Sequence, residues 1–241
     1  MEIQLSDHFT YRKLLKFVLP SIIMMIFTSI YGVVDGLFVS NYVGKTAFAA
    51  VNLVLPVLMG LAALGFMIGT GGRAIVAKTL GEGKKEKANE YFAMLVYVTI
   101  IGGLLVSLLG IILIRPISVM LGATGELLDD CILYGRISYI SFTAFLLQNV
   151  FQSFFVTAQK PKLGLKVIIV AGVTNMILDY VFIGRLGLGL AGAAIATVCG
   201  EFIGGLYPIF YFARENSSLL RLGRPSFDGK ILLKACSNGA S

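Results

Sequence analysis

The chain has 241 residues, of which 57% are hydrophobic and only 14% are charged, and its mean hydropathy is +0.87. Soluble domains carry about 25% charged residues, so this composition excludes an ordinary soluble protein. It also excludes a disordered chain, which would be poor in apolar residues, and a disulfide scaffold, because only three cysteines are present. The net charge of +7 fits a nucleic-acid-binding protein as well as a membrane protein, so the positions of the basic residues decide what it means.

Six apolar segments are long enough to cross a membrane. A bilayer core about 30 Å thick needs roughly 20 helical residues, and the short connections between these segments hold most of the charge. We therefore predict an all-α membrane protein with a cytoplasmic leader over residues 1–13, a transmembrane region over 14–212 and a cytoplasmic linker over 213–241. The predicted spans are residues 14–40, 47–70, 91–114, 132–156, 164–183 and 188–212.

The basic residues are distributed unequally between the two sides of the predicted membrane. Sixteen Lys and Arg residues flank the spans on the side of the amino terminus, and four lie on the other side. Because cytoplasmic loops are enriched in Lys and Arg, this alternation predicts a cytoplasmic amino terminus and a multi-pass protein of the cytoplasmic membrane. The charge is thus explained by topology and lipid contact, and no nucleic-acid partner is expected.

Three acidic residues fall inside the predicted spans, namely Asp35, Asp179 and Glu201. Charged groups within a bilayer are costly and usually face a cavity or a partner. Asn175 lies four residues before Asp179, and Thr197 lies four residues before Glu201, so each pair shares one helix face. Their depths predict that three helices direct these side chains into one pocket in the outer half of the membrane.

The chemistry of this predicted pocket suits a small cation. Carboxylate, amide and hydroxyl oxygens are hard donors that bind Na⁺, or hold a proton between carboxylates, and they do not suit zinc or copper. No further cofactor is expected. Two alternatives stay open from spacing alone: the polar residues would also serve as hydrogen bonds between helices, and Glu201 would pair equally well with a basic group elsewhere.

A second set of polar residues lies in the fourth predicted span. Tyr139, Gln148, Asn149 and Gln152 are present there, and Gln148 and Gln152 are one turn apart. Such a stripe would line a substrate path, and hydrogen bonding between helices would explain it equally well.

Proline and glycine residues interrupt several spans. Pro20, Pro56 and Pro208 each remove a helical hydrogen bond, and we interpret Pro20 as a candidate hinge in the first span, although a static kink would have the same sequence. Small residues recur every four positions in several spans, which predicts close helix packing. These are Gly192, Ala196, Gly200 and Gly204 in the sixth span, Gly32 and Gly36 in the first, and Gly65 and Gly69 in the second.

Motifs of soluble enzymes are absent from the sequence. Neither GxSxG nor HExxH occurs, and the run Gly44-Lys45-Thr46 lacks the upstream glycine of a phosphate-binding loop. Asp35-Gly36 is not followed by the further aspartates of a metal-dependent phosphotransferase. We therefore do not expect an enzyme.

The sequence resembles the amino-terminal lobe of the multidrug and toxic compound extrusion (MATE) family of transporters. The resemblance covers essentially the whole chain, and its most specific parts are PSIIMMIFTSIYGVVDGLFVSNYVG with Pro20 and Asp35, TNMILDYVFI with Asn175 and Asp179, and GLAGAAIATVCGE with Thr197. It implies that Asp35, Asn175, Asp179 and Thr197 form a cation site for Na⁺ or H⁺ in this lobe. Where many relatives have Gln in the sixth span, this chain has Glu201, so a third carboxylate is expected near the site.

The same resemblance implies an ion-coupled antiporter that exports organic, often cationic, small molecules. Such transporters have two lobes of six helices each, so residues 231–241 would approach a seventh helix and the carboxy-terminal lobe would be missing from this chain. The alternative is a flippase of related architecture for lipid-linked oligosaccharides, which cationic residues inside the spans would favour. An isolated structural half that pairs with another copy is a further alternative. The sequence decides neither the substrate nor the choice between Na⁺ and H⁺.

Overall fold

The computed structural model describes residues 11–240, so the predicted leader lies largely outside the described residues. In that range, six helices are long and apolar enough to cross a membrane, which confirms the six-helix, all-α prediction. The elements in chain order are α1 (Tyr11–Phe38), the π-helical segment η1 (Val39–Val43), α2 (Lys45–Gly81), α3 (Lys85–Met120), α4 (Gly125–Thr157), α5 (Pro161–Asp179), the π-helical segment η2 (Tyr180–Arg185), α6 (Gly189–Ala213) and α7 (Gly229–Ala240).

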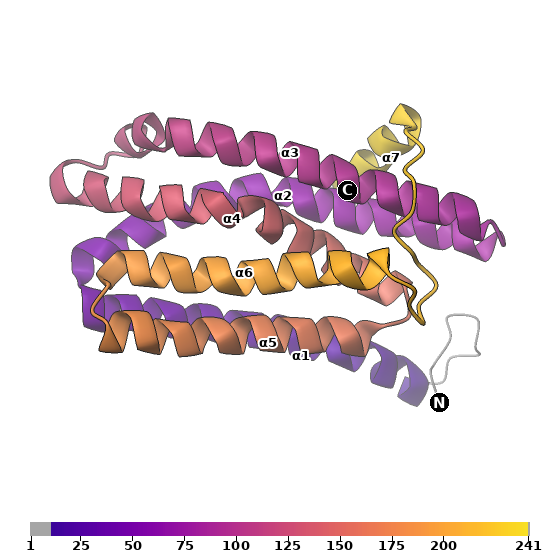
Figure 1. Cartoon of the computed structure of the whole chain (residues 1–241), viewed down its shortest axis with the longest axis horizontal. Coiled ribbons are helices and arrows are strands. Elements are labelled where there is room, and N and C mark those ends of the chain that lie inside the picture. Colours follow the sequence, from indigo (N-terminus) through magenta and orange to yellow (C-terminus); the bar gives the residue numbers. More distant parts are fainter. Residues whose placement is uncertain (1–10, 241) are drawn as a thin grey trace.

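The long helices run side by side along one axis and reverse at short turns (Figure 1). Two of them are much longer than their apolar segments, since α2 has 37 residues and α3 has 36. Both extend through the charged residues on either side of the turn that joins them, where water can solvate the polar side chains. The Lys-rich turns therefore lie at one end of the bundle, which we call the basic end, and the turns between α1 and α2, α3 and α4, and α5 and α6 lie at the other.

Helix α4 forms the centre of the bundle. It packs against α2 and α3 on one side and against α6 on the other, while α5 packs against α6 and α1 packs against α5. In their most apolar stretches, 67% of the α4 residues are buried compared with 11% of those in α1. The first span thus lies at the outside of this arrangement and is held mainly through α5.

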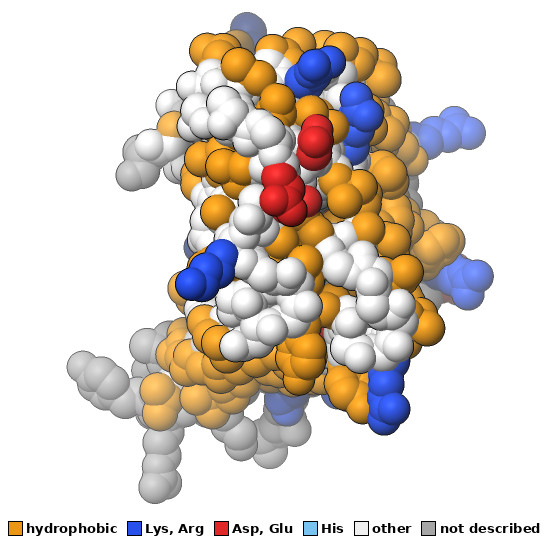
Figure 2. Space-filling model, turned by 90° about the vertical axis from the view of Figure 1, so that its left-hand side faces the viewer, with side chains coloured by type: hydrophobic (Ala, Val, Ile, Leu, Met, Phe, Trp, Pro, Cys, Tyr) orange, Lys and Arg blue, Asp and Glu red, His pale blue; other side chains and the backbone are white. Residues whose placement is uncertain are grey.

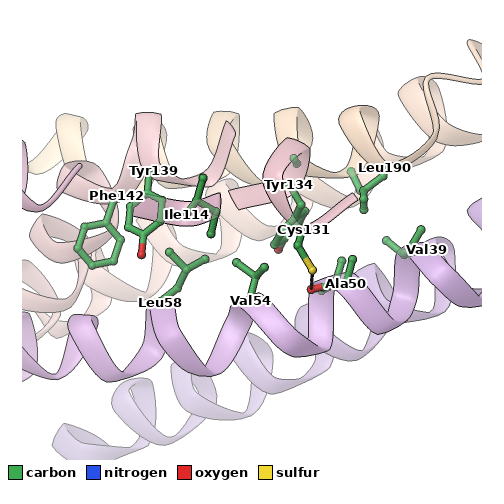
Figure 3. Close-up of a cluster of buried hydrophobic side chains, with 14 of the residues drawn as sticks. Val39, Ala50, Val54, Leu58, Ile114, Cys131, Tyr134, Tyr139, Phe142 and Leu190 are labelled. Carbon is green, nitrogen blue, oxygen red and sulfur yellow. Dashed lines mark hydrogen bonds between the residues drawn. The ribbon is translucent and has the colours of Figure 1, made fainter. Parts of the chain in front are cut away.

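Two hydrophobic cores lie at different depths along α4. The one away from the basic end joins α2, α3 and α4 to both π-helical segments and the start of α6, and Figure 3 shows part of it, including the Cys131 thiol directed at the Ala50 carbonyl oxygen 3.9 Å away. Val39 of η1 and Ile183 of η2 are both buried in this core. The other core is aromatic, and Phe92 contacts Phe154 and Phe212 with ring centroids 4.8 and 5.1 Å apart.

Close helix packing depends on glycine at particular positions. A Cβ atom on Gly200 would lie 3.0 Å from the Ala171 carbonyl oxygen of α5, and one on Gly204 would overlap the Gln148 side chain of α4. The stripe on α6 therefore faces two different helices. The expectation for the first span does not hold at Gly32, where a Cβ would meet nothing within 4 Å, because α1 is packed on one side only.

The outer surface of the bundle is apolar where lipid would surround it. Helix α3 presents large exposed side chains at a spacing of three and four residues, which places them on one face; they are Ile101, Leu104, Leu105, Leu108, Leu109 and Ile112. Figure 2 shows the end of the bundle opposite the basic end, where hydrophobic side chains dominate and the few acidic ones lie together. The apolar face of α3 is typical of a helix that contacts lipid.

The residues after α6 return to the bundle. An irregular segment over residues 214–228 leads to α7, which packs against α2. The contact is so close that a Cβ on Gly71 would overlap the Ala235 carbonyl oxygen, and one on Gly239 would overlap the Met67 carbonyl oxygen. The predicted linker thus contains a helix that is fixed to the basic half of α2.

Candidate cation-binding site

Two acidic residues of the spans lie where an α-helix changes to a π-helix. Asp35 is in the last turn of α1, just before η1, and Asp179 is the last residue of α5, directly before η2. Short π-helical turns within α-helices are frequent at functional sites because they alter the direction of nearby side chains. Since η1 and η2 contact each other and share one hydrophobic core, they hold the two aspartates on neighbouring helices at a similar depth.

The two carboxyl groups are buried and short of hydrogen-bond donors. Asp179 is 0% exposed, and neither of its oxygens accepts a hydrogen bond from any residue that the structure describes. Asp35 is partly buried, and its Oδ1 likewise has no donor among residues 11–240. The two carboxyl groups lie on helices that pack against each other. Two such groups repel each other when both are ionised, so the arrangement favours a bound cation or a shared proton.

Asn175 and Thr197 are brought together across the interface of α5 and α6. The Asn175 amide donates to the Thr197 hydroxyl at 3.4 Å, while Asn175 Oδ1 is buried without a donor in the described part of the chain. The amide is therefore oriented by its nitrogen, and its oxygen stays available as a hard ligand. Because Asn175 is one helical turn from Asp179, this oxygen and the carboxylates lie along one face of α5.

A small cavity of about 10 Å³ lies beside Asn175 and Thr197, and neither Asp35 nor Asp179 is among the residues that line it. Its polar lining comes from Asn175 and Thr197 together with Tyr31, Gln148 and Glu201. This volume is about enough for a single water molecule or small ion. The cavity therefore matches a monatomic ion or water and not an organic substrate.

Glu201 is at the α4 side of this cavity. Its Oε2 accepts a hydrogen bond from the Ser141 hydroxyl of α4, and α4 packs against α6 at this point. Among residues 11–240, no three His, Cys, Asp or Glu side chains come together closely enough to hold one metal ion. The third carboxylate thus lies near the site without forming a common ligand set with Asp35 and Asp179.

The polar stripe predicted on α4 is divided between two faces. Gln148 lines the cavity, and its Oε1 has no donor in the described residues. Tyr139 is nine residues away, which is two and a half helical turns, so it points to the other side, where it packs against Gly110 of α3. Gln152 is half-buried one turn beyond Gln148 and is not among the residues that line the cavity.

The candidate hinge residue Pro20 lies within α1, well away from Asp35.

Sequence reasoning missed two polar residues of the site. Tyr31 lies four residues before Asp35 and therefore on the same face of α1, and Ser141 lies seven residues, or about two turns, before Gln148 on α4. Helical spacing from Asp35 would have found Tyr31, whereas the role of Ser141 depends on the packing of α4 against α6. The π-helical segments have no comparable signal in the sequence.

Six membrane-spanning helices with paired carboxyl groups buried between them define a multi-pass membrane protein with an acidic intramembrane site. The sequence model of the MatE family matches residues 20–181, which include Asp35, Asn175 and Asp179. The chain belongs to the MatE family, and it is a multi-pass protein of the cell membrane.

Individual relatives and solved structures agree with this assignment. The chain is 28% identical over 209 residues to the multidrug export protein MepA of Staphylococcus haemolyticus, covering 87% of this chain and 46% of MepA. A MOP-superfamily transporter from Pyrococcus furiosus has 25% identity and a TM-score of 0.86, with 94% of this chain and 50% of that chain covered. An outward-facing MATE transporter has 24% identity and the same TM-score and coverage, which shows the shared fold. The chain spans about half the length of these proteins.

Proposed function

We propose that the chain is the amino-terminal half of an ion-coupled multidrug efflux antiporter. In this proposal an inward-moving Na⁺ or H⁺ is exchanged for an organic, often cationic, compound. The observation that carries the ion coupling is the pair of neighbouring carboxyl groups: buried Asp179, neither of whose oxygens has a hydrogen-bond donor within residues 11–240, and partly buried Asp35, whose Oδ1 has none. The similarity to MepA proteins, which are described as multidrug exporters, supports the substrate class.

The proposed coupling starts from charge repulsion. Without an ion, the carboxylates of Asp35 and Asp179 repel each other and favour an arrangement in which α1 and α5 are separated. An ion held by these groups with the oxygens of Asn175 and Thr197 removes the repulsion and favours the packed arrangement. The shift between arrangements is limited by the difference in ion affinity between them, and the π-helical segments next to both aspartates are the places where the helices would change direction.

The proposed orientation follows from the basic end of the bundle. If that end faces the cytoplasm, as the distribution of Lys and Arg predicts, the carboxyl groups lie in the outer half of the membrane. Ions from outside would then reach them first, which suits entry down an inward gradient. A flippase for lipid-linked oligosaccharides is a poorer fit, because the charged side chains at this site are acidic.

Ethidium export from vesicles tests this function. We expect that vesicles containing the chain together with a separately expressed carboxy-terminal lobe move ethidium, a lipophilic organic cation, when an opposing Na⁺ or H⁺ gradient is imposed, and that Asp35→Asn and Asp179→Asn abolish the movement. The matched control is Asp129→Asn, which removes an exposed carboxylate near the start of α4 and should leave the movement unchanged. Gradient-driven movement that persists in both site variants would contradict the proposal.

A further inference from the structure

A second cavity, of about 340 Å³, lies at the basic end of the bundle, far from the acidic site. It is formed by the end of α2, the turn over residues 82–84, the start of α3 and one face of α7, and these elements lie together in Figure 1. The efflux mechanism proposed above assigns no role to it.

The charge of this cavity is strongly positive. Four lysines line it, namely Lys78, Lys84, Lys87 and Lys234, together with a single acidic residue, Glu82. Glu82 already forms an ion pair with Lys84 at 2.9 Å, and the hydrogen bond from Lys84 holds the pKa of Glu82 below its ordinary value. The other three lysines form no ion pair with any residue that the structure describes. About three positive charges are thus left without a counterion around one space.

The local structure holds these lysines around the cavity. Gly83 has a φ of +78°, and its N–H donates to the Leu80 carbonyl oxygen at 3.0 Å, while the Lys84 N–H donates to the Thr79 carbonyl oxygen at 3.2 Å. These bonds close the end of α2 in the manner of a glycine C-cap and fix the start of α3. The Lys87 ammonium lies 5.8 Å from the centroid of the Tyr91 ring, which restrains it on the cavity side of α3.

The wall of the cavity on the bundle side is apolar. Ile75 of α2 and Tyr91 of α3 are 9% and 7% exposed, and Ile231 of α7 completes this wall. A free inorganic anion would need only the ammonium groups. A cluster of ammonium groups at the membrane surface beside an apolar wall fits a ligand that has a phosphate next to a hydrocarbon chain.

We propose that this cavity binds the phosphate headgroup of an anionic phospholipid. The basic end is the end that the distribution of Lys and Arg assigns to the cytoplasm, and the cytoplasmic leaflet is the one that carries negative surface charge. Basic pockets between membrane helices on that side are suited to lipid headgroups. Because α7 provides Lys234 and Ile231, a bound lipid would connect α7 to α2 and α3.

Binding of phosphatidylglycerol to the purified full chain in neutral detergent tests this proposal. Native mass spectrometry would measure its apparent affinity, with phosphatidylcholine as the zwitterionic comparison and millimolar inorganic phosphate, at constant ionic strength, as the competitor. The test variant is Lys78→Gln/Lys234→Gln. The matched control is Lys162→Gln/Lys166→Gln, which removes two exposed lysines of α5 at the same end of the bundle but outside the cavity. A third variant, Lys78→Arg/Lys234→Arg, keeps both charges.

We expect phosphatidylglycerol to bind the unmodified chain, the α5 control and the Arg variant with similar affinity, and to bind the Gln variant of the cavity about thirtyfold more weakly. Inorganic phosphate should not displace it. Displacement by inorganic phosphate would instead identify a free anion as the ligand and overturn the assignment to lipid. Equal weakening in both Gln variants would show diffuse attraction to the basic surface, and unchanged affinity in the cavity variant would show that the lysines do not bind lipid.

Discussion

Asp179→Asn is expected to raise the thermal stability of the purified chain when no coupling ion is present. In K⁺ buffer at alkaline pH, both oxygens of Asp179 are buried without hydrogen-bond donors in the described residues, and an uncompensated buried charge costs on the order of 3 kcal/mol or more. The neutral amide removes that cost. The expected rise in Tm, measured by thermal unfolding in detergent, is roughly 6–12 °C.

Two further variants test whether the change in Tm depends on how deeply the aspartate is buried. Asp35→Asn should raise the Tm less, because Asp35 is only partly buried and Asp179 is 0% exposed. Asp129→Asn, at an exposed position of α4, should leave the Tm nearly unchanged. A lower Tm for Asp179→Asn under these conditions would mean that the carboxylate has stabilising partners and is not a vacant ion ligand.

Gly205→Ala is expected to destabilise the bundle by about 1–3 kcal/mol, which is the usual cost of adding a methyl group to a tightly packed position. A Cβ on Gly205 would overlap the carbonyl oxygen of Ala144, and a backbone atom cannot move aside as a flexible side chain can. Helices α4 and α6 would have to separate, which would also weaken the hydrogen bond between Ser141 and Glu201. Thermal unfolding of the purified variant would measure the loss.

The control for this experiment is another helical glycine. At Gly102 of α3, a Cβ would meet nothing within 4 Å, so Gly102→Ala should be neutral or stabilise the chain by roughly 0.5–1 kcal/mol through its higher helix propensity. If both variants lost stability equally, the effect at Gly205 would have to be ascribed to glycine flexibility and not to the contact between α4 and α6.

The sequence was sufficient to predict the six helices and most of the polar residues near the site. Long apolar segments separated by basic turns have few other structures available to them in a bilayer. The spacing of Asn175 from Asp179, and of Thr197 from Glu201, set their shared helix faces without any knowledge of the fold, because an α-helix has a fixed period. The depth of Asp35 placed it at the same level as Asp179.

Other features depend on how the helices pack, which spacing along one helix does not determine. The π-helical segments η1 and η2 follow Asp35 and Asp179, and both pack into one core with α2 and α4. The bond from Ser141 to Glu201 joins residues 60 positions apart. Tyr139 was grouped with Gln148 because both are polar, although their separation of nine residues places them on opposite faces of α4.

The Tm of the purified chain as a function of Na⁺ concentration and pH, with K⁺ as the control, tests whether Asp35 and Asp179 bind the coupling ion. A ligand that binds only the folded state adds about 2.7 kcal/mol of stability at a concentration one hundred times its Kd. We predict a Tm that rises with Na⁺, or with falling pH if the proton is the coupling ion, and a loss of that response in both Asp35→Asn and Asp179→Asn. A response that persists in both variants, or a chain that responds to neither ion, would contradict ion binding at Asp35 and Asp179.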